Sequence, residues 1–254
     1  MKLVDKTYFY DYTLALPEGI SDLVNSFNVE STDFDLGYRI QASAVFSSNI
    51  EGNTLDLNSY MNLKIKNELK YKKKEVSEID ELIEAYNFAR TSDLNENTFL
   101  EAHRLLSRSI LIKSQRGKYR NQPIGVFSEN GLVYLAVEDQ YVASHMNDLF
   151  AQIAAILKEK NSVEEILYYA SLVHLRFVHI HPFIDGNGRA ARLLEKWFLA
   201  TLLGSNYWSL LSEKHYKENQ VKYYNNINLG VNFYELDYSG CIPFLLMLPE
   251  SFRK

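Results

Sequence analysis

The chain has 254 residues, of which 46% are hydrophobic and 23% charged, and its net charge at pH 7 is -5. This acidic balance disfavours a nucleic-acid-binding surface, and the single cysteine, Cys241, excludes an internal disulfide framework. Because no apolar run approaches the roughly 20 residues that span a bilayer, and no secretion signal begins the chain, we expect a cytoplasmic protein that binds neither nucleic acid nor membranes.

Apolar residues recur at helical spacing along most of the chain, which predicts a mainly α-helical fold. Residues 1–95 are expected to form an N-terminal helical region, residues 97–238 the main domain, and residues 239–254 a C-terminal segment. The N-terminal region is expected to begin irregularly and then to hold helices from Ser31-Thr32 to Glu51-Gly52, over about 59–70 and over about 75–90.

The main domain is predicted to hold helices around one β-hairpin. Asn130-Gly131 between two β-prone runs, 124–127 and 132–135, is a strong hairpin signal. A capping box of Ser162 and Glu165 begins a later helix, which Pro182 must end. Further helices are expected over 97–110, 139–159 and 189–203, with Gly204 as the last one's stop and one or two helices after it.

Residues 181–192, His-Pro-Phe-Ile-Asp-Gly-Asn-Gly-Arg-Ala-Ala-Arg, combine a base, a carboxylate, a glycine-flanked turn and two arginines at the start of a helix. Free N–H groups and the helix dipole make such a helix start an anion site. Asp185 is placed to hold a hard cation such as magnesium. Each feature alone would be a turn, a helix stop or a solvated face. Gathered together, they predict a phosphoryl or nucleotidyl transfer site with its own base.

A zinc site is not expected, because His174, His179 and His181 lack further ligands at suitable spacing. His174 and His179 are expected to be packing residues or to support the site from behind.

The twelve residues resemble the signature of Fic (Fido-domain) proteins, His-Pro-Phe-x-Asp/Glu-Gly-Asn-Gly-Arg-x-x-Arg, at every specified position. The resemblance implies a Fic/Fido helical core with one β-hairpin flap. It also implies transfer of AMP from ATP to a Ser, Thr or Tyr hydroxyl of a target protein. His181 would be the general base and Asp185 the Mg²⁺ ligand. The residues implied to bind ATP in this motif are Gly186, Asn187, Gly188, Arg189 and Arg192.

Gly188 bears on the choice of reaction. Doc-type kinases of the same superfamily carry lysine at the matching position and hold the nucleotide in the opposite direction, so glycine favours nucleotidyl transfer. The resemblance also gives Tyr223 and Tyr224 a place in the adenine pocket. The segment after them departs from the family pattern, which leaves the base contacts open.

Residues 47–52, Ser-Ser-Asn-Ile-Glu-Gly, resemble the inhibitory motif Ser/Thr-x-x-x-Glu-Gly/Asn of the Fic class in which an inhibitory helix precedes the Fic domain. The resemblance makes Ser47 and Glu51 the inhibitory residues. We expect Glu51 to form a bidentate ion pair with Arg192 and so to take the place of the γ-phosphate. Without the main motif, this hexapeptide would be only a helix end with a glycine cap.

The predicted hairpin resembles the flap of Fic proteins, which aligns the target segment by strand addition. The residues implied to dock the target are Ile124, Gly125, Val126, Leu132 and Val133. The alternative is a surface hairpin without such a role.

Taken together, these patterns predict an autoinhibited protein adenylyltransferase that uses ATP and Mg²⁺ and acts on a target protein, self-modification included. One alternative is removal of AMP at the same site with Glu51 orienting water, alone or as a second activity. A binding module without turnover is disfavoured by the intact motif. The target and the oligomeric state, a homodimer included, are left open.

Overall fold

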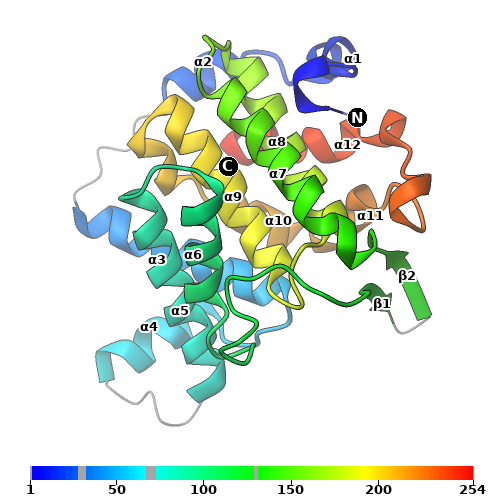
Figure 1. Ribbon diagram of the computed structural model, residues 1–254. Helices are drawn as coiled ribbons and strands as arrows, with labels where there is room; N and C mark the ends of the chain where they lie inside the picture. Colours follow the sequence, from blue (N-terminus) through cyan, green and yellow to red (C-terminus); the bar gives the residue numbers. More distant parts are fainter. Residues whose placement is uncertain (1, 28–32, 67–72, 129–130, 254) are drawn as a thin grey trace.

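The computed structural model describes residues 2–27, 33–66, 73–128 and 131–253, and these form a mainly helical protein with one two-stranded sheet (Figure 1). This agrees with the predicted fold class. The elements are α1 (Phe9–Ala15), α2 (Ile20–Asn25), α3 (Asp33–Ile50), α4 (Leu57–Lys66), α5 (Lys73–Arg90), α6 (Glu96–Leu106), β1 (Gly125–Ser128), β2 (Gly131–Leu135), α7 (Asp139–Ile156), α8 (Val163–Ile180), α9 (Asn187–Leu203), α10 (Ser212–Glu218), α11 (Gln220–Ile227), α12 (Ile242–Leu245) and α13 (Met247–Glu250).

Helices α8 and α9 pack against each other in the middle of the molecule (Figure 1). Both are buried along most of their length, α9 together with its polar and charged side chains. Helix α3 packs on α5, α9 and α10, so the N-terminal region contacts the start of the motif helix α9. One hydrophobic core, from Leu3 to Phe252, runs through all three predicted segments, whose boundaries stay predictions.

The irregular start predicted for the N-terminal region was wrong, because α1 and α2 form there. Both are short, and no side chain caps their first turn, so no local signal marks them. Tyr12, Ile20 and Val24 are buried, and both helices pack on α8, so tertiary packing stabilises them. The expected helix start at Ser31-Thr32 and the expected helix residues 67–70 lie outside the described residues.

Most other helices occur where they were predicted, with shifted ends. Helix α6 ends at Leu106 instead of near 110, and α7 ends at Ile156 instead of near 159. Helix α9 begins at Asn187, two residues early, because Gly186 takes a positive φ of 81° at the N-cap. The one or two helices predicted after Gly204 are instead the short helices α10–α13. Helices α12 and α13 pack on α8, which stabilises segments too short to be helical alone.

The hairpin is antiparallel, with Gly125 opposite Leu135 and a bulge between Val126 and Phe127. The backbone N–H of Leu135 donates to Val231 O at 2.9 Å, so the segment around Val231 covers part of the outer edge of β2. Among the described residues, no strand pairs with the other edge of β1. The predicted turn residue Asn130 lies outside the described residues. Within the part of the chain that is described, no helix combines the length and the apolar character needed to cross a membrane.

Candidate active site

Helix α8 ends where its sequence predicts. Ser162 and Glu165 form the expected capping box at its start, and Ile180 is its last residue. Pro182 disfavours α-helical geometry at His181, and His181 takes the left-handed conformation, with φ 51° and ψ 60°. This conformation costs a non-glycine residue on the order of 1–2 kcal/mol. The surrounding structure must therefore hold His181 in place.

Arg120 supplies much of that hold. Its Nε donates to the carbonyl of His181 at 2.8 Å, and its backbone N–H donates to Pro182 O at 2.9 Å. Its Nη1 donates to Gln122 O at 3.0 Å, just before β1. Arg120 is buried and thus ties the base of the hairpin to the turn that carries His181. The sequence analysis missed this role, because the partner lies sixty-one residues away.

The His181 ring is oriented for proton transfer. Its Nδ1 lies 3.2 Å from Val178 O, an acceptor only, so Nδ1 carries the proton and Nε2 is left as an acceptor. Burial lowers the pKa of His181 below its ordinary 6.5. The ring lines a cavity of about 720 Å³. A neutral imidazole with a free Nε2 can accept a proton there at pH 7.

The loop between His181 and α9 is fixed by its own side chains. Asn187 accepts from Phe183 N–H at 2.9 Å and donates to Phe183 O at 2.8 Å. His103 stacks on the Phe183 ring at 3.5 Å and bridges Gly117 N–H and Asp185 O, each at 3.0 Å. Burial lowers the pKa of His103 to about 4, so it stays neutral. The Asn187 side chain is therefore occupied by the loop, and its backbone N–H is the group left for a phosphate.

Asp185 and Arg189 lie near each other at this loop, but only Asp185 is exposed, and Arg189 is buried. The Asp185 side chain is 55% exposed, and its Oδ1 lies 3.7 Å from Nη2 of Arg189. Nη1 of Arg189 lies 3.6 Å from Oε2 of Glu78 on α5, a neighbour that the sequence analysis did not identify. Among the described residues, Nε and Nη1 of Arg189 are buried without a hydrogen-bond partner. Arg189 therefore has donors to offer an anionic ligand.

Glu51 and Arg192 form the ion pair that the sequence predicted, with Nη2 and Oε1 2.7 Å apart. The predicted bidentate geometry is wrong, because Ser47 takes Nε and part of Nη2, and the Tyr223 hydroxyl takes Nη1. Nε of Arg192 donates to Ser47 Oγ at 2.8 Å, and Nη2 also donates to Ser47 O at 2.9 Å. Burial alone would raise the pKa of Glu51, but the charge and hydrogen bond of Arg192 outweigh it and hold this pKa below 4.5.

Glu51 also lies against the first turn of α9. A β-carbon at Gly188 would lie 2.9 Å from Cδ of Glu51 and closer still to its Oε1. Only glycine leaves this space to the carboxylate. The first N–H groups of a helix have no partner within the helix, so the carboxylate occupies the part of α9 that attracts anions.

Helices α3 and α9 meet along matched polar positions that are four residues apart on each helix. Lys196 donates to Ser43 Oγ at 2.6 Å, Arg192 donates to Ser47, and Glu51 lies against Gly188. Residue numbers rise along α3 as they fall along α9, so the helices run antiparallel here. Nζ of Lys196 also donates to Leu210 O and to Glu213, which leaves this buried ammonium well satisfied.

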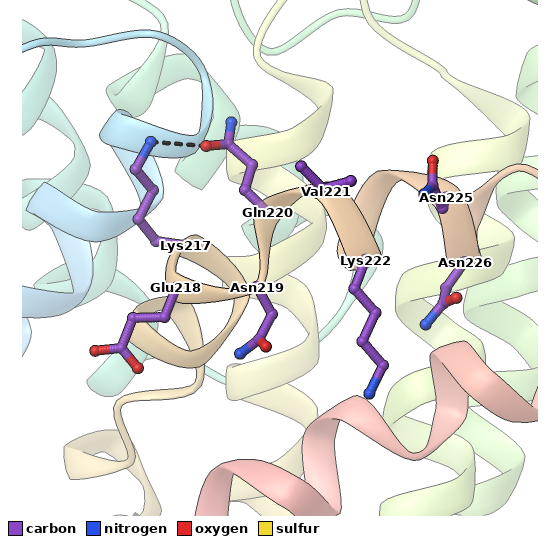
Figure 2. A pocket seen from close by; sticks show the side chains of 8 residues that line it. All are labelled: Lys217, Glu218, Asn219, Gln220, Val221, Lys222, Asn225 and Asn226. Carbon is purple, nitrogen blue, oxygen red and sulfur yellow. Dashed lines mark hydrogen bonds between the residues drawn. The ribbon is translucent and has the colours of Figure 1, made fainter.

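The C-terminal end of α3 is held by donors from α10 and α11. Nζ of Lys217 donates to Asn49 O at 2.9 Å, and Nε2 of Gln220 donates to Ile50 O, also at 2.9 Å. The Tyr224 hydroxyl donates to Ile50 O at 3.0 Å. Lys217 also donates to Oε1 of Gln220, and Figure 2 shows this pair beside the helix end. We call Lys217, Gln220 and Tyr224 the α3 clamp. They satisfy carbonyls that a helix end leaves free.

The 720 Å³ cavity brings together residues predicted separately for base, nucleotide, inhibition and target. The predicted residues that line it are His181, Gly188, Tyr223, Tyr224, Glu51, Ile124, Gly125, Val126 and Val133. Leu132, predicted with them, is exposed and does not line it. A second hollow of about 560 Å³, which Figure 2 shows along α10 and α11, is lined by none of the predicted site residues. We therefore place the candidate active site in the larger cavity.

The fold and the site define a class of helical proteins in which a histidine faces the anion-binding start of a helix, beside a hairpin. Residues 93–199 match the family model described as Fic/DOC family. The chain therefore contains a Fic/DOC family domain.

The similar relatives and solved structures also carry Fic names. The protein adenylyltransferase Fic of Drosophila sechellia is 38% identical over 72 residues, which are 28% of this chain and 13% of that protein. A Fic family protein from Desulfovibrio desulfuricans superposes with a TM-score of 0.77 at 24% identity, over 97% of this chain and 73% of the other. Fic-1 from C. elegans gives a TM-score of 0.69 at 20% identity, over 98% and 69%. The structures support the fold, and the aligned segment is a small part of the Drosophila protein.

Proposed function

We propose that this protein is an autoinhibited protein adenylyltransferase that transfers AMP from ATP to a hydroxyl side chain of a target protein. One observation carries the proposal. The acceptor Nε2 of His181 faces the same cavity as the anion-binding first turn of α9, where Glu51 lies against Gly188 and pairs with Arg192. Relatives with the printed name protein adenylyltransferase support the same reaction.

In the proposed reaction, Nε2 of His181 takes the proton of the target hydroxyl. The hydroxyl oxygen attacks the α-phosphorus of ATP, the bond to the bridging oxygen breaks, and pyrophosphate leaves. The N–H groups of the first turn of α9 stabilise charge on the phosphate oxygens. Because the pKa of His181 lies below 6.5, the base is unprotonated at neutral pH.

The residues present fit ATP and a magnesium ion. Nε and Nη1 of Arg189, which are buried and make no hydrogen bond among the described residues, suit phosphate oxygens. Within the described residues, no three His, Cys, Asp or Glu side chains gather as a metal site, but magnesium is commonly held by one carboxylate together with substrate phosphates. Asp185 would be that carboxylate, and the ion would neutralise charge on the phosphates. No protein cage is needed for such an ion.

Glu51 is proposed to hold the resting state. Its carboxylate accepts a hydrogen bond from Arg192 and fills the space beside Gly188. A γ-phosphate that needs this donor and this space is therefore excluded while Glu51 is in place. The pKa of Glu51 is depressed, so the ion pair is present above the ordinary pKa of 4.5 and is lost only as pH falls through the lower folded-state value. Autoinhibition should therefore persist across the physiological pH range.

The hairpin is proposed to align the target. Strand β1 lines the active-site cavity with Val126 and keeps an edge that no described strand occupies. An extended target segment that pairs with this edge would lie beside His181 without a strict sequence requirement.

Cys241 is a buried free thiol, which agrees with the proposal of a cytoplasmic place of action.

A second candidate, removal of AMP, is favoured by one observation: Glu51 lines the same cavity as His181. A carboxylate there could orient a water molecule toward the phosphorus of AMP-modified protein. AMP transfer and AMP removal differ in the role of Glu51. Loss of its carboxylate would raise AMP transfer, because Glu51 inhibits it, and would abolish AMP removal, because Glu51 orients the water.

The test uses ATP labelled on the α- or the γ-phosphate, with wild type, Glu51→Gly and Glu51→Gly/His181→Ala against a lysate. Loss of one charge-assisted hydrogen bond, worth about 1.5–3 kcal/mol, should raise AMP transfer on the order of ten- to a hundred-fold in Glu51→Gly. The double variant should transfer nothing. Label from the γ-phosphate would make the protein a kinase, and unchanged transfer in Glu51→Gly would refute the switch.

A further inference from the structure

A chain of buried polar side chains continues from Arg192 through Tyr223, which lines the cavity, into the core. Nη1 of Arg192 lies 3.2 Å from the Tyr223 hydroxyl, which lies 2.9 Å from Nε2 of His174. Nδ1 of His174 lies 2.8 Å from Oε2 of Glu195, and the Tyr216 hydroxyl donates to Oε1 of Glu195 at 2.8 Å. All five side chains are almost fully buried. Helices α8, α9, α10 and α11 each contribute to this chain.

The hydrogen bonds of this chain have one consistent direction. A carboxylate only accepts hydrogen bonds, so Glu195 accepts one from Nδ1–H of His174 and one from the hydroxyl of Tyr216. With Nδ1 of His174 as the donor to Glu195, Nε2 is the acceptor for the hydroxyl of Tyr223. The Tyr223 oxygen keeps its lone pairs for Nη1 of Arg192. The pair of His174 and Glu195 thus turns the Tyr223 oxygen toward the guanidinium.

Among the described residues, Arg192 makes four hydrogen bonds, and they fall into two groups. Three go to α3 and the residue that follows it, namely to Ser47 Oγ, Ser47 O and Glu51 Oε1. The fourth goes to Tyr223. Withdrawal of Glu51, which ATP binding requires under the proposed function, loosens the first group. The bond to Tyr223 comes from α11 and does not depend on α3.

We propose that His174 and Glu195 are positioning residues that act through the Tyr223 hydroxyl. They keep the Arg192 guanidinium oriented for the distal phosphates of a nucleoside triphosphate once Glu51 has withdrawn. This inference rests on the proposed function and gives Tyr223 a role distinct from a contact to the adenine base. A free arginine side chain has many rotamers, so a fixed partner preserves the orientation that a phosphate needs.

The experiment measures binding of ATP and of AMP by titration calorimetry, in the full chain carrying Glu51→Gly. To this parent we add Tyr223→Phe, His174→Phe, His174→Gln, or the first two together. Loss of the hydrogen bond to a charged group should weaken ATP binding on the order of ten-fold. AMP binding should not change, because AMP has no distal phosphates. His174→Gln, whose amide can accept near the position of Nε2, should restore part of the ATP affinity.

The variant Tyr223→Phe/His174→Phe tests most directly whether His174 acts through Tyr223. If His174 acts through the Tyr223 hydroxyl, Tyr223→Phe/His174→Phe binds ATP as weakly as Tyr223→Phe alone. Additive losses, equal losses for ATP and AMP, or unchanged ATP binding in both single variants would each overturn the proposal. A parent that binds ATP no more tightly than AMP would also overturn it, while the labelled-ATP assay reports separately on the proposed function.

Glu195→Gln is a second variant in case His174→Phe fails to fold, with urea unfolding as the check. It keeps the shape and removes the charge that fixes the proton of His174. A selective loss of ATP affinity in Glu195→Gln supports the proposal, and retained ATP affinity contradicts it.

Discussion

Ser47 and Arg192 are joined by two hydrogen bonds, from Nε to Oγ at 2.8 Å and from Nη2 to the carbonyl oxygen at 2.9 Å. The serine of the inhibitory motif thus holds the guanidinium from the side, while Glu51 meets it at 2.7 Å. Ser47 of α3 and Glu51, directly after that helix, act on one arginine together, which makes the serine as specific a target for mutation as the glutamate.

Ser47→Ala should raise AMP transfer, because Arg192 loses a buried acceptor and is freer to turn toward ATP. We expect an increase on the order of ten-fold, the lower end of what a hydrogen bond to a charged group is worth, about 1.5 kcal/mol, because the carbonyl of Ser47 still accepts from Nη2. The measurement is transfer of α-labelled phosphate. Ser43→Ala is the matched control, because Ser43 lies one turn earlier on α3 and binds Lys196 instead. Equal activation by both variants would point to general loosening of α3.

The α3 clamp gives a second route to activation that leaves every predicted site residue intact. Gln220→Ala and Lys217→Met should each raise AMP transfer about two- to ten-fold, because a hydrogen bond is worth about 0.5–1.5 kcal/mol. Lys222→Met, on α11 like Gln220 (Figure 2), is the control for loss of an ammonium, because the exposed ammonium of Lys222 pairs with Glu250 and does not contact α3. If Lys217→Met and Lys222→Met behave alike, the clamp does not restrain Glu51.

The pH dependence of AMP transfer should distinguish the role of His181 as general base from the inhibitory role of Glu51. In Glu51→Gly, AMP transfer should fall on the acid side with an apparent pKa below 6.5, because burial lowers the pKa of His181 and protonation removes the acceptor. In wild type, acidification to about pH 6 should not relieve inhibition, because the pKa of Glu51 lies below 4.5. A rate profile of both proteins from pH 5 to about 8 measures this. Activation of wild type near pH 6 would contradict it.

Arg120→Met should lower both stability and turnover. It removes the donor to the His181 carbonyl and leaves buried carbonyls unsatisfied, which should cost at least about 2 kcal/mol in the free energy of unfolding. Turnover per folded molecule should fall because His181 is no longer fixed. Arg116→Met is the control, since Arg116 also donates to carbonyls, Leu111 O at 2.8 Å among them, but does not touch the His181 turn. Urea unfolding and labelled transfer measure the two effects.

Much of the fold was predictable because its signals are local. The capping box of Ser162 and Glu165, the stop at Pro182 and the cap at Gly204 placed α8 and α9 to within two residues. Helices α1, α2, α12 and α13 lacked such signals, because helices this short are stable only when packed. The same holds for Arg120 and His103, whose partners are far away in sequence.

The sequence by itself determined the chemistry on offer: the histidine, the carboxylates, the arginines and the glycines of the site, together with the helices that present them. Tertiary structure alone decided how these groups meet. It brought Ser47 to Arg192 across 145 positions, where the serine takes Nε, one of the donors that a bidentate Glu51 could use. It also placed Tyr223, His174 and Glu195 behind that arginine. Such pairings are set by the packing of whole helices, because two buried polar groups find each other only once the chain between them has folded.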